Sequence, residues 1–258
     1  MILIYNSTHN TQMTTQMTTQ MTTPILINEY YEWNSKNSTG LTLSQFLEEG
    51  NIPSSYKKFF SKNKHIIQHI SETLQSDSHT IYPPPNQVFK ALYLTPLKKI
   101  KAVIIGMDPY HNGSAVGLAF SVKHGNPINP SLRSIYKELE NENFSVNKNG
   151  DLSSWASKGV LLLNTALTVQ AGTPDSHSSL WWNFTTELIT FISKHNQDIH
   201  WILLGKNAHQ LIPYINSKNL HCTSHPMPLA ANKPCGKFPP FFGSNIFRKI
   251  PGIDWTIN

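Results

Sequence analysis

Three residues with chemically useful side chains, Asp108, Asn164 and His225, each follow a short apolar run of the chain. A carboxylate can stabilise a positive charge or orient a water molecule, and an imidazole can hydrogen-bond a developing anion. An amide presents a hydrogen-bond donor and an acceptor side by side. In one pocket, these three groups could bind a polar substrate and polarise one of its bonds.

The elements that must position these residues can be predicted from apolar patterning. Continuous apolar runs predict four buried strands, at residues 103–105, 159–163, 199–204 and 220–223. Helical spacing predicts a helix that starts at Pro130, one around Leu188, and a further helix after Gly205. Apolar strands that alternate with amphipathic helices predict an α/β fold, a three-layer α/β/α sandwich around a central, mostly parallel four-stranded sheet.

The position of the polar residues follows from this fold class. In open α/β sheets, ligands bind outside the carboxyl ends of the strands. The segments just past the four predicted strands contain residues 108–111, Asn164, residues 205–207, and His225 with Pro226. The acid, the amide and the imidazole are therefore expected at one edge of the sheet.

Composition sets broad limits on the kind of protein. The chain has 258 residues, of which 39% are hydrophobic, so it can bury the core of one α/β domain. Lys and Arg total 21 against 15 for Asp and Glu, a net charge of +6, which suits a polyanionic partner without requiring one. The only cysteines, Cys222 and Cys235, are too few for a disulfide framework or a four-thiol zinc site.

The N-terminal segment differs from the rest of the chain. Residues 12–23 repeat Gln-Met-Thr-Thr three times, a polar low-complexity pattern that buries little. We expect residues 1–38 to be a disordered tail and residues 39–258 to form a single domain. The chain lacks an apolar run of about 18 residues and a basic start typical of signal peptides, so we expect neither a membrane span nor secretion.

Several motifs resemble those of family-1 uracil-DNA glycosylases, in the same order along the chain. Residues 106–111 read Gly-Met-Asp-Pro-Tyr-His, where the family has Gly-Gln-Asp-Pro-Tyr-His. The likeness continues at residues 117–122, at 130–132, at 159–165, and at 225–229, His-Pro-Met-Pro-Leu, where the family has His-Pro-Ser-Pro-Leu. It covers roughly residues 41–255, and five motifs in order are far more specific than one.

The resemblance implies an enzyme that flips uracil out of DNA and hydrolyses its bond to deoxyribose, leaving an abasic site. It gives Asp108 the carboxylate role and His225 the imidazole role. It assigns base binding to Asn164, to Phe120 by stacking, to Tyr110 by excluding a 5-methyl group, and to Met107 at the water site. It assigns DNA contacts to Pro130, Ser131, Gly205, Lys206, Pro226, Met227, Leu229 and Lys233, with Leu229 as an apolar wedge.

The same resemblance sets the expected partners. They are uracil-containing DNA, single- or double-stranded, and a proteinaceous glycosylase inhibitor. No cofactor or metal is expected, and the chain is expected to act as a monomer. The compartment would be the cytoplasm in a bacterium and the nucleus in a eukaryote or for a virus.

The sequence also departs from the family pattern. Met107 replaces a glutamine that helps hold the catalytic water, and methionine accepts hydrogen bonds only weakly. Met227 and Ala230 replace two serines, which should weaken the grip on phosphates, and Lys206 replaces a third. The link at residues 231–240 is longer than usual, which predicts an extended wedge loop with additional DNA contacts.

Two other functions remain open at this point. The departures are compatible with a catalytically weak or inactive DNA-binding or processivity protein on the same fold, although such a protein would not need Asp108, Asn164 and His225. A metal enzyme could use His111, His221, Cys222 and His225. Neighbouring residues of a strand point to opposite faces, however, and no second ligand cluster has a familiar spacing.

Overall fold

The four predicted strands form one sheet, with closely matching boundaries. In the computed structural model, which describes residues 31–35, 38–48, 50–147 and 149–256, they are β4 (Ala102–Gly106), β5 (Val160–Asn164), β7 (His200–Leu204) and β8 (Leu220–Thr223). The order is β5-β4-β7-β8 and every pair is parallel. Every residue of β4 and β5 is buried, as their continuous apolar sequences predict. The predicted sandwich fold is confirmed.

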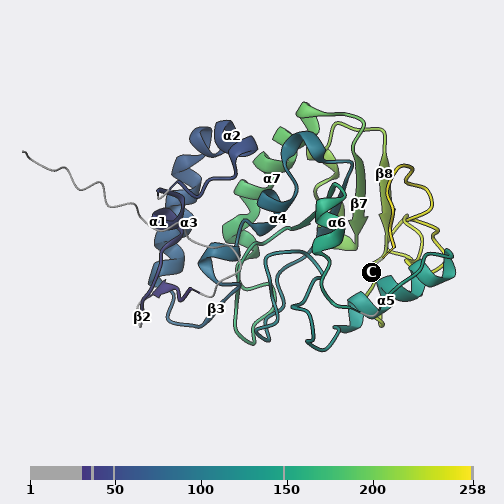
Figure 1. Ribbon diagram of the computed structural model, residues 1–258, viewed down its shortest axis with the longest axis horizontal. Helices are drawn as coiled ribbons and strands as arrows, with labels where there is room; N and C mark the ends of the chain where they lie inside the picture. Colours follow the sequence, from purple (N-terminus) through teal and green to yellow (C-terminus); the bar gives the residue numbers. More distant parts are fainter. Residues whose placement is uncertain (1–30, 36–37, 49, 148, 257–258) are drawn as a thin grey trace, which may run out of the picture.

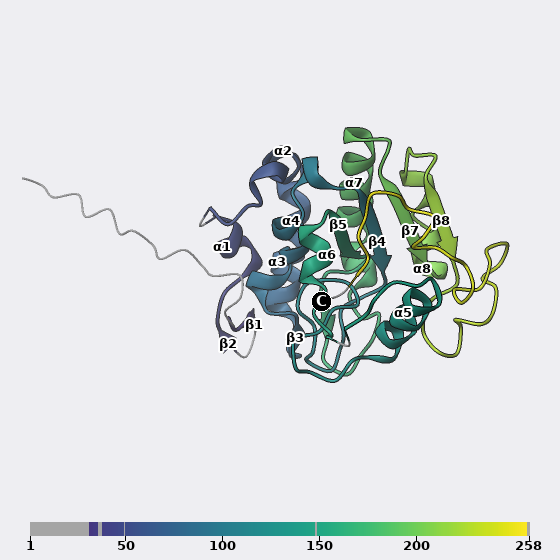
Figure 2. The ribbon, with the colours of Figure 1, turned by 45° about the vertical axis from the view of Figure 1, so that its right-hand side comes forward.

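Helices cover both faces of this sheet (Figures 1 and 2). Between β4 and β5 the chain forms α5 (Pro130–Asn141) and α6 (Ser153–Ser157), and between β5 and β7 it forms α7 (Ser178–His195). These connections cross the sheet in opposite directions, so the right-handed crossover rule places α6 and α7 on opposite faces. Between β7 and β8 lie α8 (Lys206–His209) and η4 (Ile212–Tyr214), which contacts α7.

The part of the chain before β4 lies beyond the β5 end of the sheet (Figure 2). Helix α3 packs on α7, and α4 packs on β5 and α6. Strand β3 pairs antiparallel with β6 (Val169–Gln170). The elements of this part are β1 (Asn34–Ser35), β2 (Ser38–Thr39), α1 (Leu43–Glu48), η1 (Ser54–Tyr56), α2 (Lys57–Lys62), α3 (Lys64–Ser76), β3 (Ile81–Tyr82), η2 (Pro85–Gln87), α4 (Lys90–Leu94) and η3 (Leu97–Lys99).

An aromatic cluster joins these N-terminal helices to α7. Phe59, Phe60 and Phe89 each pack a ring against Phe184, with centroids 5.3, 6.1 and 5.7 Å apart. Edge and tilted ring contacts of this kind stabilise a core beyond the apolar area that they bury. The cluster therefore makes α7 the common support of the N-terminal helices and the sheet.

The predicted tail lies mostly outside the described residues, which exclude 1–30 and 36–37. Within it, Trp33 is buried in the core, and its indole Nε1–H donates to the carbonyl of Pro83 at 2.9 Å. The boundary at residue 39 stays a prediction, but Trp33 packs with the domain.

Two buried carboxylates, Glu138 in α5 and Glu142 at its C-terminal cap, hold the segment that follows the last strand. The carboxylate of Glu138 accepts hydrogen bonds from the backbone N–H groups of Gly243 and Asn245, at 3.0 and 3.2 Å. Glu142 accepts from those of Phe247 and Arg248, at 3.3 and 2.5 Å. Buried carboxylates are stabilised by such donors, so α5 and residues 243–248 form one unit.

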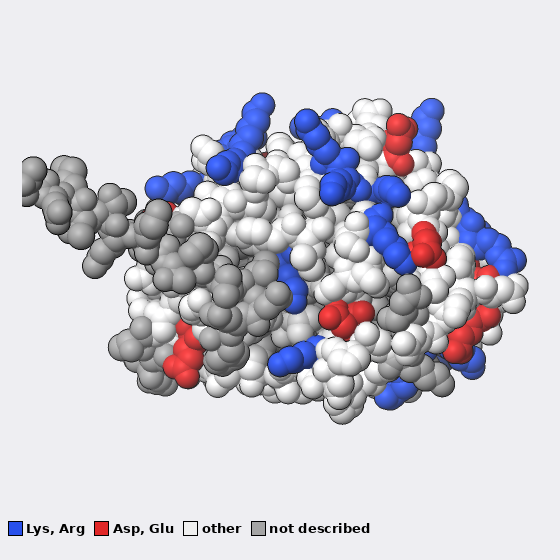
Figure 3. Space-filling view, viewed as in Figure 1, with Lys and Arg blue, Asp and Glu red and all other residues white. Residues whose placement is uncertain are grey.

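The surface carries both signs of charge. Figure 3 shows Lys and Arg side chains along the upper edge of one face and around its right-hand end, with Asp and Glu interspersed. In the part of the chain that the structure describes, no helix is both long and apolar enough to cross a membrane.

Candidate active site

The carboxyl ends of the four strands border one cleft of about 1060 Å³, part of it open to solvent. Parallel pairing sets Gly106 level with Asn164 and Leu204 level with Thr223, so the residues that follow emerge at one edge. Ten of the predicted site residues line this cleft: Met107, Asp108, Tyr110, Phe120, Ser131, Asn164, Gly205, Lys206, His225 and Met227.

The acid side of the cleft is Asp108, just past β4. Its Oδ2 accepts a hydrogen bond from the backbone N–H of Asp175 at 2.7 Å. Burial raises the pKa of Asp108, and the nearby charge of Asp175 raises it further, while the Asp175 N–H and the charge of His111 lower it. The net shift is upward, so the fold makes ionisation of this carboxyl harder than in water.

The imidazole side is His225, just past β8. Its Nδ1 accepts the backbone N–H of Met227 at 3.0 Å, so in the neutral ring the proton lies on Nε2. Burial lowers the pKa of His225 to about 4, which keeps the ring neutral at pH 7. The ring lies against Gly205, where a Cβ would be 2.8 Å from the Cβ of His225. The structure therefore presents a neutral Nε2–H donor.

The amide of Asn164 lies at the end of β5 and lines the same cleft as Asp108 and His225. The residue is 9% exposed, and no described residue hydrogen-bonds to its side-chain amide. Its Oδ1 lies over Gly106, where a Cβ would be only 2.3 Å away, so glycine is needed there for space. An amide held in this way is available to a ligand in the cleft.

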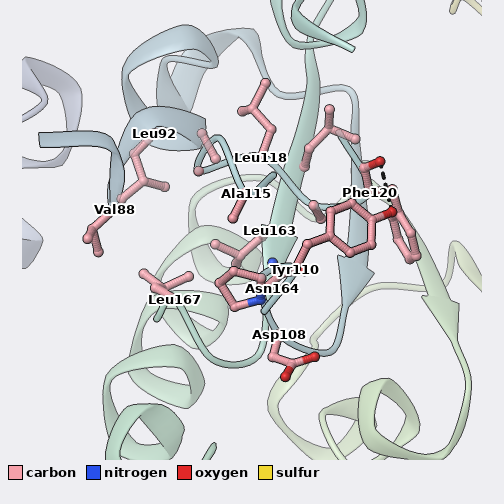
Figure 4. A pocket seen from close by; sticks show the side chains of 15 residues that line it. Val88, Leu92, Asp108, Tyr110, Ala115, Leu118, Phe120, Leu163, Asn164 and Leu167 are labelled. Carbon is pink, nitrogen blue, oxygen red and sulfur yellow. Dashed lines mark hydrogen bonds between the residues drawn. The ribbon is translucent and has the colours of Figure 1, made fainter. Parts of the chain in front are cut away.

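Two aromatic side chains form a wall of the cleft. Tyr110 donates its hydroxyl to the carbonyl of Phe120 at 3.1 Å, and the Phe120 ring lies 6.0 Å from that of His225. Phe120 adopts φ +65°, a conformation uncommon for a bulky residue, so the surrounding structure must hold it there. Tyr110, Phe120 and Asn164 also line a smaller, mostly apolar cavity of about 450 Å³ behind the cleft (Figure 4).

In Figure 4 the carboxyl group of Asp108 points away from the apolar side chains of that smaller cavity, such as Leu92, Leu118 and Leu163. The polar atom that could act on a substrate is thus separated from the apolar packing that supports it. The loop that follows β4 can therefore pack against the core and still present the Asp108 carboxyl group to the cleft.

The rim of the cleft is formed by two helix starts. Ser131 lies in the first turn of α5 and Lys206 begins α8. Four predicted residues do not line the cleft, namely Pro130, Pro226, Leu229 and Lys233. Pro226 is buried, whereas Pro130 and Lys233 are exposed to solvent and Leu229 is 79% exposed. The exposure of Leu229 is the largest among the bulky apolar side chains that the structure describes.

Sequence reasoning missed several residues of this site. Pro174 lines the cleft, and Asp175 contacts Asp108 directly. The chain offered no pattern for Asp175, because 67 residues separate it from its partner. The sequence could have indicated only that the short segment between β6 and α7 lies near the site.

The four residues of the metal hypothesis are not gathered. Within the described ranges, no group of three or more His, Cys, Asp or Glu side chains is placed to hold a metal ion. The ring of His221 instead stacks on that of His200, with Nε2 and Nδ1 3.0 Å apart. Cys222 and Cys235 are both free thiols.

Known proteins resemble this chain over most of its length. The model of the uracil DNA glycosylase superfamily matches residues 93–244. A uracil-DNA glycosylase of Acinetobacter baumannii is 44% identical over 193 residues, 69% of this chain and 79% of its own. One of Escherichia coli is 46% identical over 191 residues, 68% and 81% of the two chains.

Solved structures resemble it as well. The crystal structure of mimivirus uracil-DNA glycosylase superposes with a TM-score of 0.75 at 25% identity, over 87% of this chain and 94% of that one. A mimivirus UNG variant in complex with UGI gives 0.74 at 26% identity, over 80% and 89%.

Proposed function

The chain belongs to the uracil-DNA glycosylase family, and on that premise we propose which of its residues remove uracil from DNA and how. It is a monofunctional DNA glycosylase of base excision repair, which hydrolyses the bond between uracil and deoxyribose. The placement of Asp108, Asn164 and His225 in one cleft is the observation that carries the assignment of roles.

The chemistry needs opposite electrostatic help at the two ends of one bond. As the bond between C1′ and N1 breaks, its electron pair leaves with uracil and the sugar becomes positive. Water then adds to C1′, and the proton that it loses passes to Asp108 or solvent and balances the negative charge of uracil, which leaves as the neutral base. Asp108 stabilises the positive sugar and orients the water, while the neutral Nε2–H of His225 donates to an oxygen of the uracil anion. A donor of this kind contributes roughly 10²–10³-fold to turnover.

The amide and the aromatic wall read the base. Asn164 can donate to one oxygen of uracil and accept from its ring N–H, a pattern that the cytosine edge does not match. Phe120 supports the base by stacking, and Tyr110 fills the space that the 5-methyl group of thymine would need. The free amide of Asn164 and the hydrogen bond that fixes Tyr110 support these roles.

The rim residues bind the DNA backbone around the flipped nucleotide. The first turn of α5 carries Pro130 and Ser131, and backbone N–H groups at a helix start attract phosphate. Gly205 and Lys206 begin α8 on the other side of the cleft. Pro226 and Met227 shape the loop whose exposed Leu229 fills the gap left by the base.

The loop that carries Leu229 lies in an unusually basic part of the chain. Residues 199–253 contain six Lys or Arg and no Asp or Glu, so this segment carries a charge equal to the whole net charge of +6. Its tip, from Cys235 to Phe238, closes with two backbone hydrogen bonds of 3.0 and 3.1 Å, and Phe238 packs on His209 of α8 at 4.2 Å. We infer that exposed Lys233 and Lys237 contact phosphates of duplex DNA.

Salt dependence tests this inference. Each phosphate contact contributes a slope of about 0.9 to the fall of log affinity with log salt in duplex DNA. Replacing both Lys233 and Lys237 by alanine should lower this slope by about 1.8, the value for two phosphate contacts. Excision of uracil from a short single strand should stay unchanged. Lys218→Ala is the matched control, because it removes a lysine of the same segment outside the loop. An unchanged slope in the double variant would contradict the inference.

The general assignment is tested by incubating the chain with single-stranded DNA that contains one uracil, then cleaving abasic sites with alkali. We expect strand cleavage at the uracil and its loss in the Asp108→Asn variant. The departures at Met107 and Met227 leave a weakly active DNA-binding protein as the second candidate. Binding without cleavage, even at high enzyme, would favour that candidate.

The remaining partners are proposals. The mimivirus variant was crystallised with UGI, and we propose that an inhibitor protein can cover the same cleft of this chain. We also propose that residues 39–258, with Trp33 packed on them, form a single domain that acts as a monomer. Binding of UGI that blocks excision, and a monomeric mass in solution, are the expected results.

A further inference from the structure

The turn that precedes α7 holds the loop of Asp108 at two points. The backbone N–H of Gly172 donates to the carbonyl of His111 at 3.0 Å, and that of Asp175 donates to Oδ2 of Asp108 at 2.7 Å. The second contact is short and involves an ionisable acceptor, the geometry of a strong hydrogen bond. It engages Oδ2 of the carboxyl group, which also interacts with the backbone N–H of Asp108 itself.

The conformation of Asp175 is what aims its N–H at Asp108. Its φ of +67° lies in the left-handed region, which only Gly, Asn and Asp adopt at low cost. Ser178 closes the turn, because its N–H donates to the Asp175 carbonyl at 3.2 Å and its hydroxyl donates to Oδ1 of Asp175. A β-branched residue at this position would drive the N–H away from Asp108.

A buried hydrogen-bond chain anchors the turn from behind. The indole of Trp181 donates to Thr168 Oγ1 at 2.7 Å, and that hydroxyl lies 2.9 Å from Nδ1 of His177. The other nitrogen of His177, Nε2, lies 3.1 Å from a carboxylate oxygen of Asp77. Burial lowers the pKa of His177, and a neutral ring with its proton on Nε2 satisfies every bond in this chain.

We propose that Asp175 is a positioning residue for catalysis, whose backbone N–H fixes the orientation of the carboxyl group of Asp108 toward the attacking water. The proposal rests on the catalytic role assigned to Asp108. It adds a residue that neither the motifs nor the cleft lining contains, and it gives the buried chain from Trp181 to Asp77 a purpose beyond packing. The turn acts on the reaction only through Asp108.

The side chain of Asp175 has a separate effect, which is opposite in sign to that of its N–H. Its charge favours the protonated form of Asp108, whereas the N–H and the charge of His111 favour the ionised form. Replacing Asp175 by asparagine keeps the left-handed turn and removes only the charge. The acidic limb of the kcat/KM profile should therefore move to lower pH, with little change of the plateau.

The decisive variant changes the backbone preference. Asp175→Val should lower kcat about 10²-fold, the scale of a misplacement of 1 Å, with KM unchanged. Asp175→Gly, which tolerates the left-handed turn, should retain most of the rate. The matched control is Asn143→Val, because Asn143 is exposed and has a similar φ of +64° far along the chain from the cleft. It should not alter kcat.

A double-variant cycle separates positioning from general damage. In an Asp108→Ala background, Asp175→Val should cost nothing further in single-turnover excision, because the group it positions is gone. An equal loss in both backgrounds, or a Val variant as fast as wild type, would overturn the proposal. Failure of the underlying function would look different, since Asp108→Ala would then excise uracil as fast as the wild-type chain.

Discussion

The two sides of the cleft fix their reactive groups in different ways. Asp108 depends on a backbone N–H from Asp175, 67 residues further along the chain, whereas His225 depends on the N–H of Met227, two residues away. The imidazole is thus oriented by its own turn, and the acid is oriented only once β6 and α7 are in place. A change that destabilises the fold should therefore disturb the orientation of Asp108 before that of His225.

Burial has opposite consequences on the two sides. It raises the pKa of Asp108 and lowers that of His225, so it favours the neutral form of both groups. In the proposed mechanism, His225 acts in its neutral form, as a hydrogen-bond donor. Asp108 would act in its ionised form, which is the form that burial disfavours.

The largest expected effect comes from neutralising the acid side. Asp108→Asn should lower kcat by roughly 10³-fold or more, within the range for a group that acts on the reacting atoms, and should leave DNA binding largely intact. Because the ionised carboxyl is disfavoured by burial, the variant should be at least as stable as the wild type at neutral pH. Single-turnover excision, DNA binding and the melting temperature measure these effects. A large loss of stability would show that Asp108 is a structural residue.

The next largest effect tests the imidazole side. His225→Leu should lower kcat roughly 10²–10³-fold by removing the donor to the uracil anion. His225→Gln keeps an N–H group and should lose less. Equal losses in the two variants would mean that the ring acts by shape and not by donating a hydrogen bond.

The amide of Asn164 should control which base is accepted. Asn164→Asp, when protonated or reoriented, can present the pattern that cytosine requires, so excision of cytosine should become detectable while excision of uracil falls. Single strands that carry one cytosine or one uracil give the comparison. A variant that unfolds would leave the base-reading role without support, so its circular dichroism spectrum should be recorded first.

The imidazole side also predicts a dependence of stability on pH. The pKa of His225 falls from 6.5 to about 4 on folding, so the unfolded chain binds a proton that the folded chain does not in this window. The free energy of unfolding should therefore decrease as the pH drops from 6.5 towards 4. His177, His200, His209 and His221 shift in the same direction, so His225→Leu should remove part of the decrease. A variant with an identical pH profile would contradict the shift at His225.

The smallest effect should come from the departure beside the acid. Met107→Gln restores a donor next to Asp108 and should leave kcat unchanged or raise it a few-fold, as measured at saturating single-stranded substrate. The equivalent hydrophobic control is Met107→Leu, which should stay near wild type. A sharp loss in Met107→Gln would show that the methionine has its own role in the cleft.

The sequence predicted those parts of the molecule that local pattern determines. Strand β8 begins at Leu220 and ends at Thr223 as expected, and α5 starts at Pro130, where proline fits a first helical turn. The glycosylase function and family membership are confirmed by the relatives, whereas the roles of the site residues remain predictions.

Long-range contacts explain what could not be predicted. The bond from Asp175 to Asp108 and the bond from His177 to Asp77 link residues 67 and 100 positions apart, and no period or motif in the chain relates them. The hydrogen bond from Trp33 to Pro83 is a similar case. Trp33 follows a polar, repetitive segment of the sequence, so its burial in the core could not be predicted from the pattern around it.

Helix α5 has a mechanical consequence for how DNA is met. Its 12 residues span about 18 Å, from Ser131, the proposed phosphate-binding residue, to the end beside Glu138 and Glu142, whose carboxylates hold the segment that follows the proposed wedge loop. Under the proposed roles, a helix of this length keeps the phosphate contact and the exposed Leu229 at a constant separation. We therefore expect a duplex to bend in order to reach both, and uracil in easily bent sequences to be excised fastest.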